Sequence, residues 1–364
     1  MITEYLLPLF LLCYVVQLAV LTLTSRKPRG EKDPAATPFV SVVIAARDEE
    51  RNIVACLESA LQQTYKPESF EVIVVNDHST DGTEALCQQI AQRFPNFRHI
   101  SAKESPTLRG KTNALDQGIS QARGEIILIT DADCTVPATW VESTARRYKP
   151  SVGIVGGMTI QKAESWFEGM QSLDWVYLLG LAAATISLRI PLSTIGNNLS
   201  FRKSAYDGVG GYRKIPFSVT EDFVLFQAIV QTGKWDYLCP IDPSVLVTSQ
   251  ACRTWRELFH QKHRWGKGGL GMKLSGLLVG VIGFGLNVFL LLTLLSSSCL
   301  LFLPGFGIKI AIDYVFLRTI LKRQLRLDLL RFFVPFELYF MIYVLLLPFV
   351  VFFGGPVVWK GRSY

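Results

Sequence analysis

Acidic residues occur in this chain at spacings that suit the chemistry of phosphate-bearing substrates. Asp131 and Asp133 are separated by one residue and directly follow an apolar segment at 125–130. Because side chains alternate along an extended segment, both carboxylates project to one side and can together face a divalent cation that bridges two phosphates. Asp222 follows Thr220 and Glu221 at the start of a helical pattern, where capping alone would also explain an acid.

A second chemical element lies in the pentad 261–265. Gln261, Arg264 and Trp265 fall at i, i+3 and i+4, so a helix presents them on one face. Arg264 can fork onto a diphosphate, and Trp265 offers a flat apolar surface to a sugar or a lipid head. Interfacial Trp and Arg anchors have the same composition, so this helix can also rest on a membrane.

These elements occur in a fixed order along the chain: Asp77, the DxD pair at 131–133, TED at 220–222 and QxxRW at 261–265. The ordered series resembles the signature of membrane-bound family 2 glycosyltransferases. That group includes cellulose, chitin and hyaluronan synthases and enzymes that glycosylate lipids. The resemblance implies a GT-A fold, an α/β sheet that binds a nucleotide-sugar, over about residues 38–270.

The resemblance also implies roles on the donor side. Asp77 would bind the uracil ring, Asp131 would lie towards the ribose, and Asp133 would hold Mg²⁺ or Mn²⁺. Lys111 lies in a stretch like the family's GKxxAL element, near the nucleotide-sugar, although a solvated helix lysine is the alternative. Glu49 belongs to a segment like the first nucleotide-contacting loop, although an acid at a helix N-terminus is also favourable there.

On the acceptor side, the resemblance makes Asp222 the general base that removes the proton of the acceptor hydroxyl. Arg264 would stabilise the departing UDP, and Gln261 would lie with the donor. The stretch 196–202 resembles an acceptor-side GxNxxFR element. The residues expected to line the acceptor site are Trp265, Glu221, Asn198 and Arg202.

The elements that must position these residues are strands and helices in alternation. Short β-branched runs at 39–45 and 70–75 are each followed by apolar residues at helical spacing, and 125–130 supplies a third strand. This alternation predicts a mostly parallel sheet that is covered on both faces and binds its ligand beyond the carboxyl ends of the strands. No GxGxxG follows the first strand and no GxxxxGK[ST] occurs, so the usual cradles for dinucleotides and for P-loop hydrolysis are lacking.

Apolar segments at both ends of the chain indicate a membrane protein. Residues 5–23 are long enough to cross a bilayer and are followed by Arg26, Lys27 and Arg29. A retained anchor (1–25) is favoured over a signal peptide, because no basic n-region precedes the run and no small-x-small cleavage site follows it. The basic flank places the following domain in the cytoplasm.

A C-terminal membrane region of two or three helices is predicted over 274–356. Its clear spans are 277–295 and 332–353. The segment 299–317 carries Lys309 and Asp313 and is either a kinked or re-entrant segment or a broken helix whose charges pair. A basic loop at 318–331 favours the cytoplasmic side. The charged tail at 359–364 also favours the cytoplasm, but one further full crossing after the loop would place the tail outside. Residues 166–190 suit an interface helix.

Charge and cysteine content exclude other classes. The net charge of +7 comes mostly from the flanks of membrane segments, without the basic and aromatic alternation that nucleic-acid binding favours. Seven cysteines show no CxxC spacing and no pairing with histidine that would indicate zinc, so reduced structural thiols are expected.

Together these observations predict an inverting, metal-dependent transfer of a hexose from a UDP-sugar to a lipid, at the cytoplasmic face of a bacterial membrane. The alternative is a processive polysaccharide synthase, in which a channel must enclose the polymer; the small number of membrane segments favours the lipid acceptor. A non-catalytic nucleotide-sugar sensor is a remote third possibility, and a transporter is disfavoured by the size of the polar domain.

Overall fold

The computed structural model describes residues 2–25, 37–272, 274–296, 299–359 and 362–363. The chain divides into two compact units. The sheet unit comprises Pro28–Ile160 and Ser193–Gln250, and the helical unit comprises Met1–Lys27, Gln161–Leu192 and Ala251–Tyr364. The basic residues 26, 27 and 29 and part of the charged tail lie outside the described residues.

The sheet unit is built on a seven-stranded sheet with the order β3-β2-β1-β4-β7-β5-β8. Its strands β1, β2, β3 and β4 are parallel neighbours, while β7 runs antiparallel to both β4 and β5. The strands are β1 (Val40–Ala46), β2 (Phe70–Asn76), β3 (Phe97–Ser101), β4 (Ile126–Asp131), β5 (Val152–Gly156), β7 (Leu199–Arg202) and β8 (Asp236–Leu238). The prediction of a mostly parallel α/β sheet is confirmed, with β7 as the antiparallel exception.

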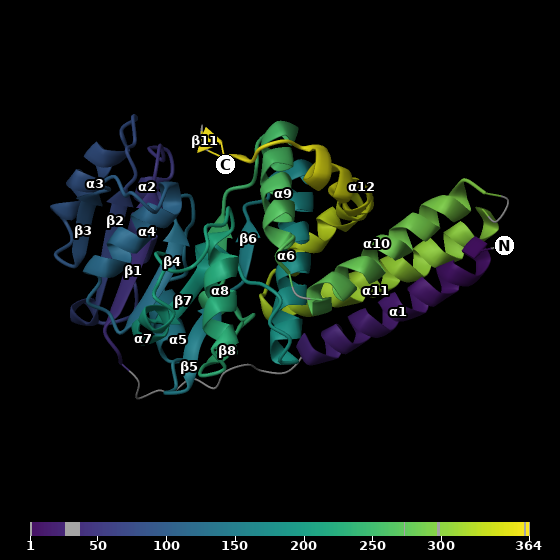
Figure 1. Cartoon of the computed structure of the whole chain (residues 1–364), viewed down its shortest axis with the longest axis horizontal. Coiled ribbons are helices and arrows are strands. Elements are labelled where there is room, and N and C mark those ends of the chain that lie inside the picture. Colours follow the sequence, from purple (N-terminus) through teal and green to yellow (C-terminus); the bar gives the residue numbers. More distant parts are fainter. Residues whose placement is uncertain (1, 26–36, 273, 297–298, 360–361, 364) are drawn as a thin grey trace. The chain divides into compact units, whose positions relative to one another are not determined.

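Helices cover both faces of this sheet, because successive side chains of each buried strand point in opposite directions. Val42 of β1 belongs to a buried cluster with Leu57 of α2 (Ile53–Leu61) and Ile90 of α3 (Thr83–Ala91). Val43 faces the other way, where Gly118 of α4 (Gly110–Gln121) lies against it. Figure 1 shows α4 over β1 and β2.

Shorter elements complete the sheet unit. They are η1 (Pro67–Ser69), α5 (Trp140–Ala145), η2 (Gly196–Asn198), α7 (Lys203–Gly208), α8 (Glu221–Gln231) and η3 (Pro243–Val245). A separate two-stranded sheet pairs β6 (Thr159–Gln161) with β9 (Val247–Ser249).

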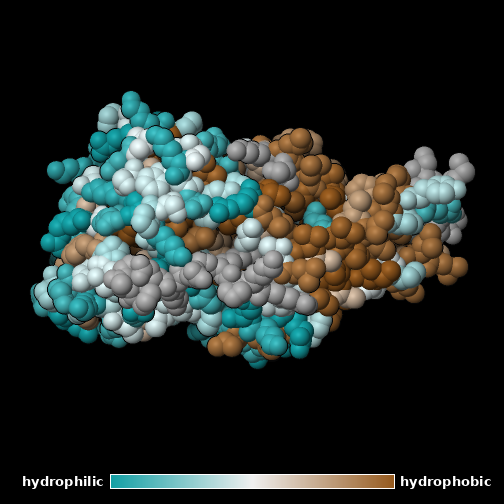
Figure 2. Space-filling model, turned by 90° about the horizontal axis from the view of Figure 1, so that it is seen from below, coloured by the Kyte–Doolittle hydropathy of each residue, from teal (hydrophilic) through white to brown (hydrophobic). Residues whose placement is uncertain are grey.

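The helical unit contains the long apolar helices. They are α1 (Ile2–Ser25), α6 (Trp166–Ser187), α9 (Trp255–Gly269), α10 (Leu274–Leu294), α11 (Phe302–Arg323) and α12 (Phe333–Phe353), joined by η4 (Cys299–Leu301) and η5 (Leu327–Phe332) and followed by a small hairpin of β10 (Val358–Trp359) and β11 (Arg362–Ser363). By length and composition, four helices can cross a membrane: Glu4–Ser25, Gly276–Leu294, Cys299–Arg323 and Leu327–Phe353. Figure 2 shows apolar side chains gathered on the surface over these helices.

Contacts along the bundle fix the directions of α1, α10 and α11, which lie side by side in Figure 1. Arg323 at the end of α11 donates a hydrogen bond to the carbonyl of Ser25 at the end of α1, so these helices run parallel. Helix α10 runs antiparallel to them, because Gly283 lies near Tyr14 of α1 whereas Gly285, further along α10, lies near Phe10, which is closer to the start of α1. The ends of α1 and α11 therefore lie at the same end of the bundle as the start of α10.

Polar side chains inside the helical unit are paired with one another. The Lys309 ammonium lies 2.8 Å from Asp313 and 2.6 Å from Glu337 of α12. The hydroxyl of Tyr14 donates to Asp313 at 2.6 Å and lies 2.7 Å from the hydroxyl of Tyr177. The charges within 299–317 pair, as one of the two expected alternatives had it, but the helix is not broken, since α11 is continuous from Phe302. Pro304 is accommodated in the first turn of α11, where its missing N–H costs little.

Two boundaries differ from the sequence predictions. The helices that contain 166–190 and 261–265 pack with the membrane helices rather than with the sheet, so the expected domain at 38–270 is interrupted. The basic segment 318–331 is mostly helical, because α11 continues to Arg323 and η5 begins at Leu327. Helix α6 packs on α11 through contacts such as that of Gly180 with Ile320.

Candidate active site

The carboxyl edge of the sheet collects the acidic residues that were predicted from the sequence. Asp77 directly follows β2, and Asp131 is the last residue of β4. Strand β1 lies between them, with Ala46 beside Asn76 and Ala45 beside Asp131. The predicted position of both aspartates at strand ends is therefore confirmed, and both lie where open α/β sheets bind ligands.

The loops after β1 and β2 hold each other in place. Asp48 accepts a hydrogen bond from the amide of Thr80 at 2.8 Å, and Glu50 accepts one from the amide of Gly82 at 3.0 Å. Asp48 and His78 have positive φ values of 51° and 55°, a backbone conformation that most residues avoid unless their surroundings hold them in it. The acids beside Glu49 thus shape the loops.

Glu49 and Asp77 are anchored within these loops. The Glu49 carboxylate accepts a hydrogen bond from the side-chain amide of Asn52 at 2.7 Å. Asp77 is buried, its amide donates to the carbonyl of Ala46 at 2.8 Å, and its carbonyl accepts from the guanidinium of Arg47 at 2.9 Å. The backbone at Asp77 is therefore fixed from both sides before any ligand arrives.

Lys111 joins two of the sequence motifs. Its ammonium lies 2.6 Å from Asp131 and 2.9 Å from Glu221, and the Glu221 side chain is 9% exposed. Burial by itself lowers the pKa of Lys111, but the two carboxylates raise it above its ordinary range, so the ammonium stays charged. Gly110 has a φ of +55° immediately before it, and a side chain there would be strained.

Asp222 lies in the first turn of α8, as the sequence predicted. Its carboxylate accepts a hydrogen bond from the amide of Phe223 at 2.8 Å. A Cβ on Gly196 would lie 3.2 Å from the Asp222 carboxylate, so η2 and the start of α8 approach closely. Thr130 in turn donates to the carbonyl of Asn197 at 2.9 Å, which ties η2 to the end of β4. These contacts place Asp222 next to the residues that flank Asp131.

The sequence predicts Asp133 as a ligand of a cation that also binds a substrate diphosphate. In the part of the chain that the structure describes, no three His, Cys, Asp or Glu side chains group together as metal ligands. This fits Mg²⁺, which proteins commonly hold with one or two carboxylates while phosphates and water complete the shell. Burial and the nearby aspartates raise the pKa of the Cys56 and Cys134 thiols.

Asn198 and Arg202 do not occupy the positions expected of acceptor ligands. The Asn198 amide is buried and makes three hydrogen bonds, to Trp140, to the carbonyl of Met158 and to that of Val245. Arg202 pairs in register with Ile126, at the opposite end of β4 from Asp131.

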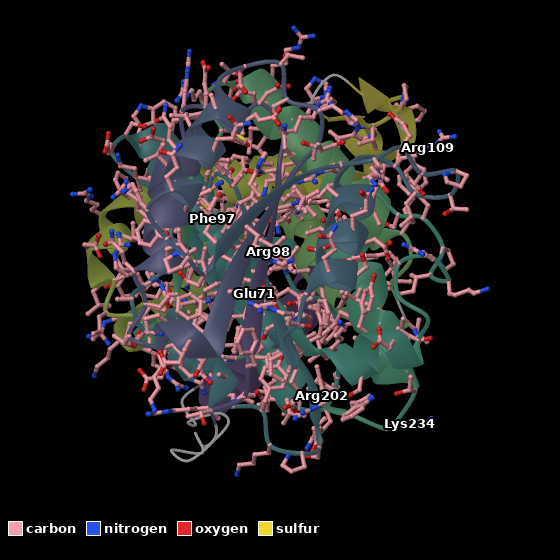
Figure 3. The ribbon with its side chains drawn as sticks, turned by 90° about the vertical axis from the view of Figure 1, so that its left-hand side faces the viewer. Glu71, Phe97, Arg98, Arg109, Arg202 and Lys234 are labelled. Atoms are coloured by element: carbon pink, nitrogen blue, oxygen red, sulfur yellow. The ribbon has the colours of Figure 1, made fainter. Side chains whose placement is uncertain are left out.

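Arg202 forms an ion pair with Glu125 and donates to backbone carbonyls at that opposite end of the sheet. Figure 3 shows Arg202 well separated from Arg109, which is near Lys111 in the chain. The acceptor role expected for Arg202 stays a prediction, and the antiparallel β7 places this residue at the end of β4 opposite Asp131. Asn198 supports η2 from within the core.

The QxxRW residues lie on α9, in the helical unit. The Trp265 ring lies 5.2 Å from the Trp175 ring of α6. The side-chain oxygen of Gln261 is buried without a hydrogen-bond partner among the described residues. Arg264 is partly exposed on the same helix. The predicted helix is thus confirmed, and its packing partners are α6 and α12.

Sequence reasoning missed residues whose importance depends on long-range contacts. Thr130, which supports η2, belongs to no recognisable motif. Arg47 and Gly196 lie in segments that the motifs cover, but their contacts with Asp77 and Asp222 could not be predicted from those motifs. Lys262 occupies a variable position of QxxRW but is fully buried against Asp174. The signal that could have pointed to Asp174 was its charge, since it lies within the apolar segment 166–190.

The fold and the site together define a glycosyltransferase of the GT-A class, with acidic residues at the carboxyl edge of a mostly parallel sheet. The chain belongs to glycosyl transferase family 21, whose family model matches residues 6–364. The glycosyltransferase prediction made from the motifs is therefore confirmed, and the matching family is family 21.

This chain spans about half the length of the named relatives that it matches. Beta-monoglucosyldiacylglycerol synthase from Nostoc sp. (strain PCC 7120) is 28% identical over 243 residues, 64% of this chain and 49% of that protein. Poly-beta-1,6-N-acetyl-D-glucosamine synthase from Staphylococcus epidermidis is 28% identical over 236 residues, 63% of this chain and 54% of that protein. One relative is thus named for a glycolipid product and the other for a polysaccharide.

A solved structure shares the fold over nearly the full chain. The mannosyltransferase PcManGT from Pyrobaculum calidifontis, in complex with GDP-Man and Mn²⁺, superposes with a TM-score of 0.61 at 18% identity. The match covers 93% of this chain and 99% of that one. At this level of identity, the similarity concerns the fold.

Proposed function

We propose that this glycosyltransferase moves one hexose from a UDP-sugar to a membrane lipid, with inversion at the sugar C1. The observation that carries the proposal is the link from Lys111 to Asp131 and Glu221. It brings the donor motif and the proposed catalytic motif to one end of the sheet, beside Asp77. A transfer reaction requires the donor diphosphate and the general base at the same place.

The donor is proposed to lie across the carboxyl edge of the sheet. The Asp77 carboxylate would accept a hydrogen bond from the imide N–H of uracil. Arg47 donates to the backbone carbonyl of Asp77 and so holds the loop after β2 in place. Asp131 would lie towards the ribose, with Lys111 close to the diphosphate. PcManGT was solved with a guanine nucleotide, so donors with both bases belong in the experimental panel.

The reaction step is a single displacement. The acceptor hydroxyl oxygen forms a bond to the sugar C1 as the bond from C1 to the diphosphate oxygen breaks, and the electron pair leaves with UDP. The hydroxyl proton passes to the Asp222 carboxylate. Asp222 suits this role because contacts to Gly196 and to its own helix hold the carboxylate in one place.

A divalent cation would neutralise charge on the departing diphosphate when bound. Asp133 would hold it, with Asp131 close by and already paired with Lys111. Lys111 contributes a permanent positive charge at the same edge. The role of Arg264 at the diphosphate and those of Gln261 and Trp265 at the substrates remain predictions from the motif.

A lipid acceptor is favoured over polymer secretion by the packing of the membrane helices. A secreting synthase must enclose a polymer-wide channel, whereas α1, α10 and α11 approach each other closely. A Cβ on Gly305 would lie 3.2 Å from Leu290 of α10 and 3.5 Å from Leu7 of α1. The relative from Nostoc, named as a glucosyldiacylglycerol synthase, supports the same choice. The relative from S. epidermidis supports the polysaccharide alternative.

We further propose that α1, α10 and α11 cross the membrane and that α12 does not. Helix α12 follows the end of α11 and ends beside α9, where a Cβ on Gly354 would lie 2.8 Å from His263. Since α9 leads directly into the start of α10, both ends of α12 lie on one side of the bundle. Three crossings put the basic segment 318–331 and the charged tail together in the cytoplasm, which is what the positive-inside rule favours.

The test is nucleotide release by the detergent-purified chain with Mn²⁺, using UDP-sugars and GDP-mannose, with and without diacylglycerol or ceramide. We expect release that depends on one UDP-sugar and on lipid, and a glycolipid product of inverted anomeric configuration. A growing polymer without added lipid would support the synthase alternative. Release from GDP-mannose alone would overturn the UDP assignment.

The base is tested by Asp222→Asn, with Asp207→Asn on the exposed face of α7 as the matched control. Asp222→Asn should lower transfer by about 10²- to 10⁴-fold, the usual range for loss of a general base, with UDP affinity unchanged. Unchanged transfer would show that another group takes the proton.

A further inference from the structure

A buried ion pair lies next to the QxxRW residues. The Lys262 ammonium of α9 contacts the Asp174 carboxylate of α6, and their side chains are 4% and 0% exposed. Neither residue belongs to the defining positions of the motif. A charged pair at this depth is unusual, because removing two charges from water costs several kcal/mol per ion.

Aromatic side chains surround the Lys262 ammonium. It lies 4.5 Å from the centre of the Trp265 ring and 4.9 Å from that of the Tyr343 ring of α12. These distances are within the range of cation–π interactions. The hydroxyl of Tyr339 also donates to Asp174 at 3.4 Å. The ammonium therefore contacts the motif tryptophan directly and connects it to α6 and α12.

Helix α6 contacts the Trp265 ring directly as well. The Trp175 ring, which follows Asp174 in the chain, lies 5.2 Å from the Trp265 ring at an angle of 51°. Lys262 and Trp175 thus limit the orientations open to Trp265. Helix α9 itself is held close to α12, because a Cβ on Gly266 would lie 3.1 Å from Leu347.

Stability alone does not account for the ion pair. Replacing a buried ion pair with well-packed apolar residues is often neutral or stabilising. In addition, the second oxygen of Asp174, Oδ1, is buried without a hydrogen-bond partner in the part of the chain that the structure describes, which adds to the cost. What an ion pair supplies that apolar packing does not is one defined geometry.

We propose that Lys262 and Asp174 are positioning residues that orient Trp265, and through it the acceptor, for transfer. This inference rests on the proposed function. Lys262 touches no reacting atom; it fixes the tryptophan by its charge above the ring, and Asp174 fixes Lys262. Loss of the pair should therefore lower the rate of transfer while the nucleotide site in the sheet unit keeps its affinity.

The test replaces both partners at once, in Lys262→Met/Asp174→Leu, so that no single charge is left buried. The matched control is Lys162→Met/Glu164→Leu, which removes an ion pair whose side chains are 59% and 71% exposed. The rescue variant is Lys262→Arg, which keeps the charge and can stack on Trp265. Melting temperature, UDP affinity, kcat and acceptor KM are measured on the full chain in detergent.

We expect the buried double variant to melt within a few degrees of the natural chain and to bind UDP equally well, with kcat lowered by about 10- to 100-fold through misplacement. Lys262→Arg should recover most of that loss, and the exposed double variant should be unchanged. A kcat within twofold of the natural chain, or unfolding of the buried double variant, would overturn the proposal. Absence of transfer by the natural chain would instead overturn the proposed function.

Discussion

Lys111 and Glu221 are 2.9 Å apart although 110 positions separate them in the chain. Lys111 begins α4 on one face of the sheet, and Glu221 begins α8 beyond the antiparallel strand β7. Because Lys111 also contacts Asp131, the first aspartate of DxD and the glutamate of TED share one ammonium. This connection joins the proposed donor and acceptor halves of the site.

Lys111→Met should therefore damage both activity and stability. The substitution leaves the Glu221 carboxylate buried without its cation and takes the partner from Asp131. We expect the free energy of unfolding to fall by about 2 kcal/mol, less than for a fully buried pair since Asp131 is one-third exposed. Thermal unfolding and donor kinetics measure the two effects.

The double variant Lys111→Met/Glu221→Gln separates these effects. It should regain most of the stability, because no unpaired carboxylate is buried, and should stay inactive. Recovery of activity along with stability would show that Lys111 has only a structural role.

Gly196→Ala should lower transfer without unfolding the chain. The new methyl group would lie 3.2 Å from the Asp222 carboxylate and displace it by a few tenths of an ångström. We expect kcat to fall by about 10-fold, since small misplacements of a reacting group are costly. The control is Gly208→Ala, where the methyl group meets no atom within 4 Å. Equal kcat values for the two variants would contradict a fixed Asp222.

Glu71→Gln should make the sheet unit less sensitive to acid. Burial raises the pKa of the Glu71 carboxyl. Hydrogen bonds from the Arg123 amide and Ser41, together with the charges of Arg98 and Arg123, outweigh this effect, so the pKa lies below its usual value. Figure 3 labels Glu71 and Arg98, which lie close together on neighbouring strands.

Because the folded pKa of Glu71 is depressed, its stabilisation is present above the ordinary pKa of about 4.3 and is lost as the pH falls through the folded value. The melting temperature of the natural chain should drop in that acidic window, and the drop should be smaller in Glu71→Gln. Glu68→Gln, at an exposed position, should behave like the natural chain.

Lys309→Met should strongly destabilise the helical unit. Lys309 is fully buried and is the cation that faces both Asp313 and Glu337, so its removal leaves two carboxylates close together in an apolar setting. The expected loss is about 3–5 kcal/mol, the usual cost of breaking a buried ion pair. Thermal unfolding in detergent measures it. Lys322→Met, at an exposed position of the same helix, should change the melting temperature little.

Single cysteines test the three-crossing arrangement in a chain whose natural cysteines have been replaced. Leu295→Cys, after α10, should react with an impermeant thiol reagent added to intact cells. Leu325→Cys, after α11, and Pro356→Cys, after α12, should react only once the membrane is opened. Labelling of Pro356→Cys in intact cells would show that α12 crosses the membrane.

Local features of the site followed from the sequence because they depend on near neighbours. The apolar run before Asp131 predicts a strand that ends at the aspartate, since alternation and β-branching act over a few residues. The same holds for Asp222 in a helix first turn and for Trp265 on a helix face. The motifs indicated the reaction class, and the apolar runs indicated the helices that are long and apolar enough to cross a membrane.

Tertiary structure decided what those residues contact. The antiparallel direction of β7 carries Arg202 away from Asp131, and no pattern within 199–202 encodes the direction of a strand. The contact of α9 with α6 includes the pair of Lys262 with Asp174, which lies more than 80 residues earlier in the chain. Such pairings depend on which distant surfaces bury the most apolar area together, a property of the whole chain rather than of any short segment.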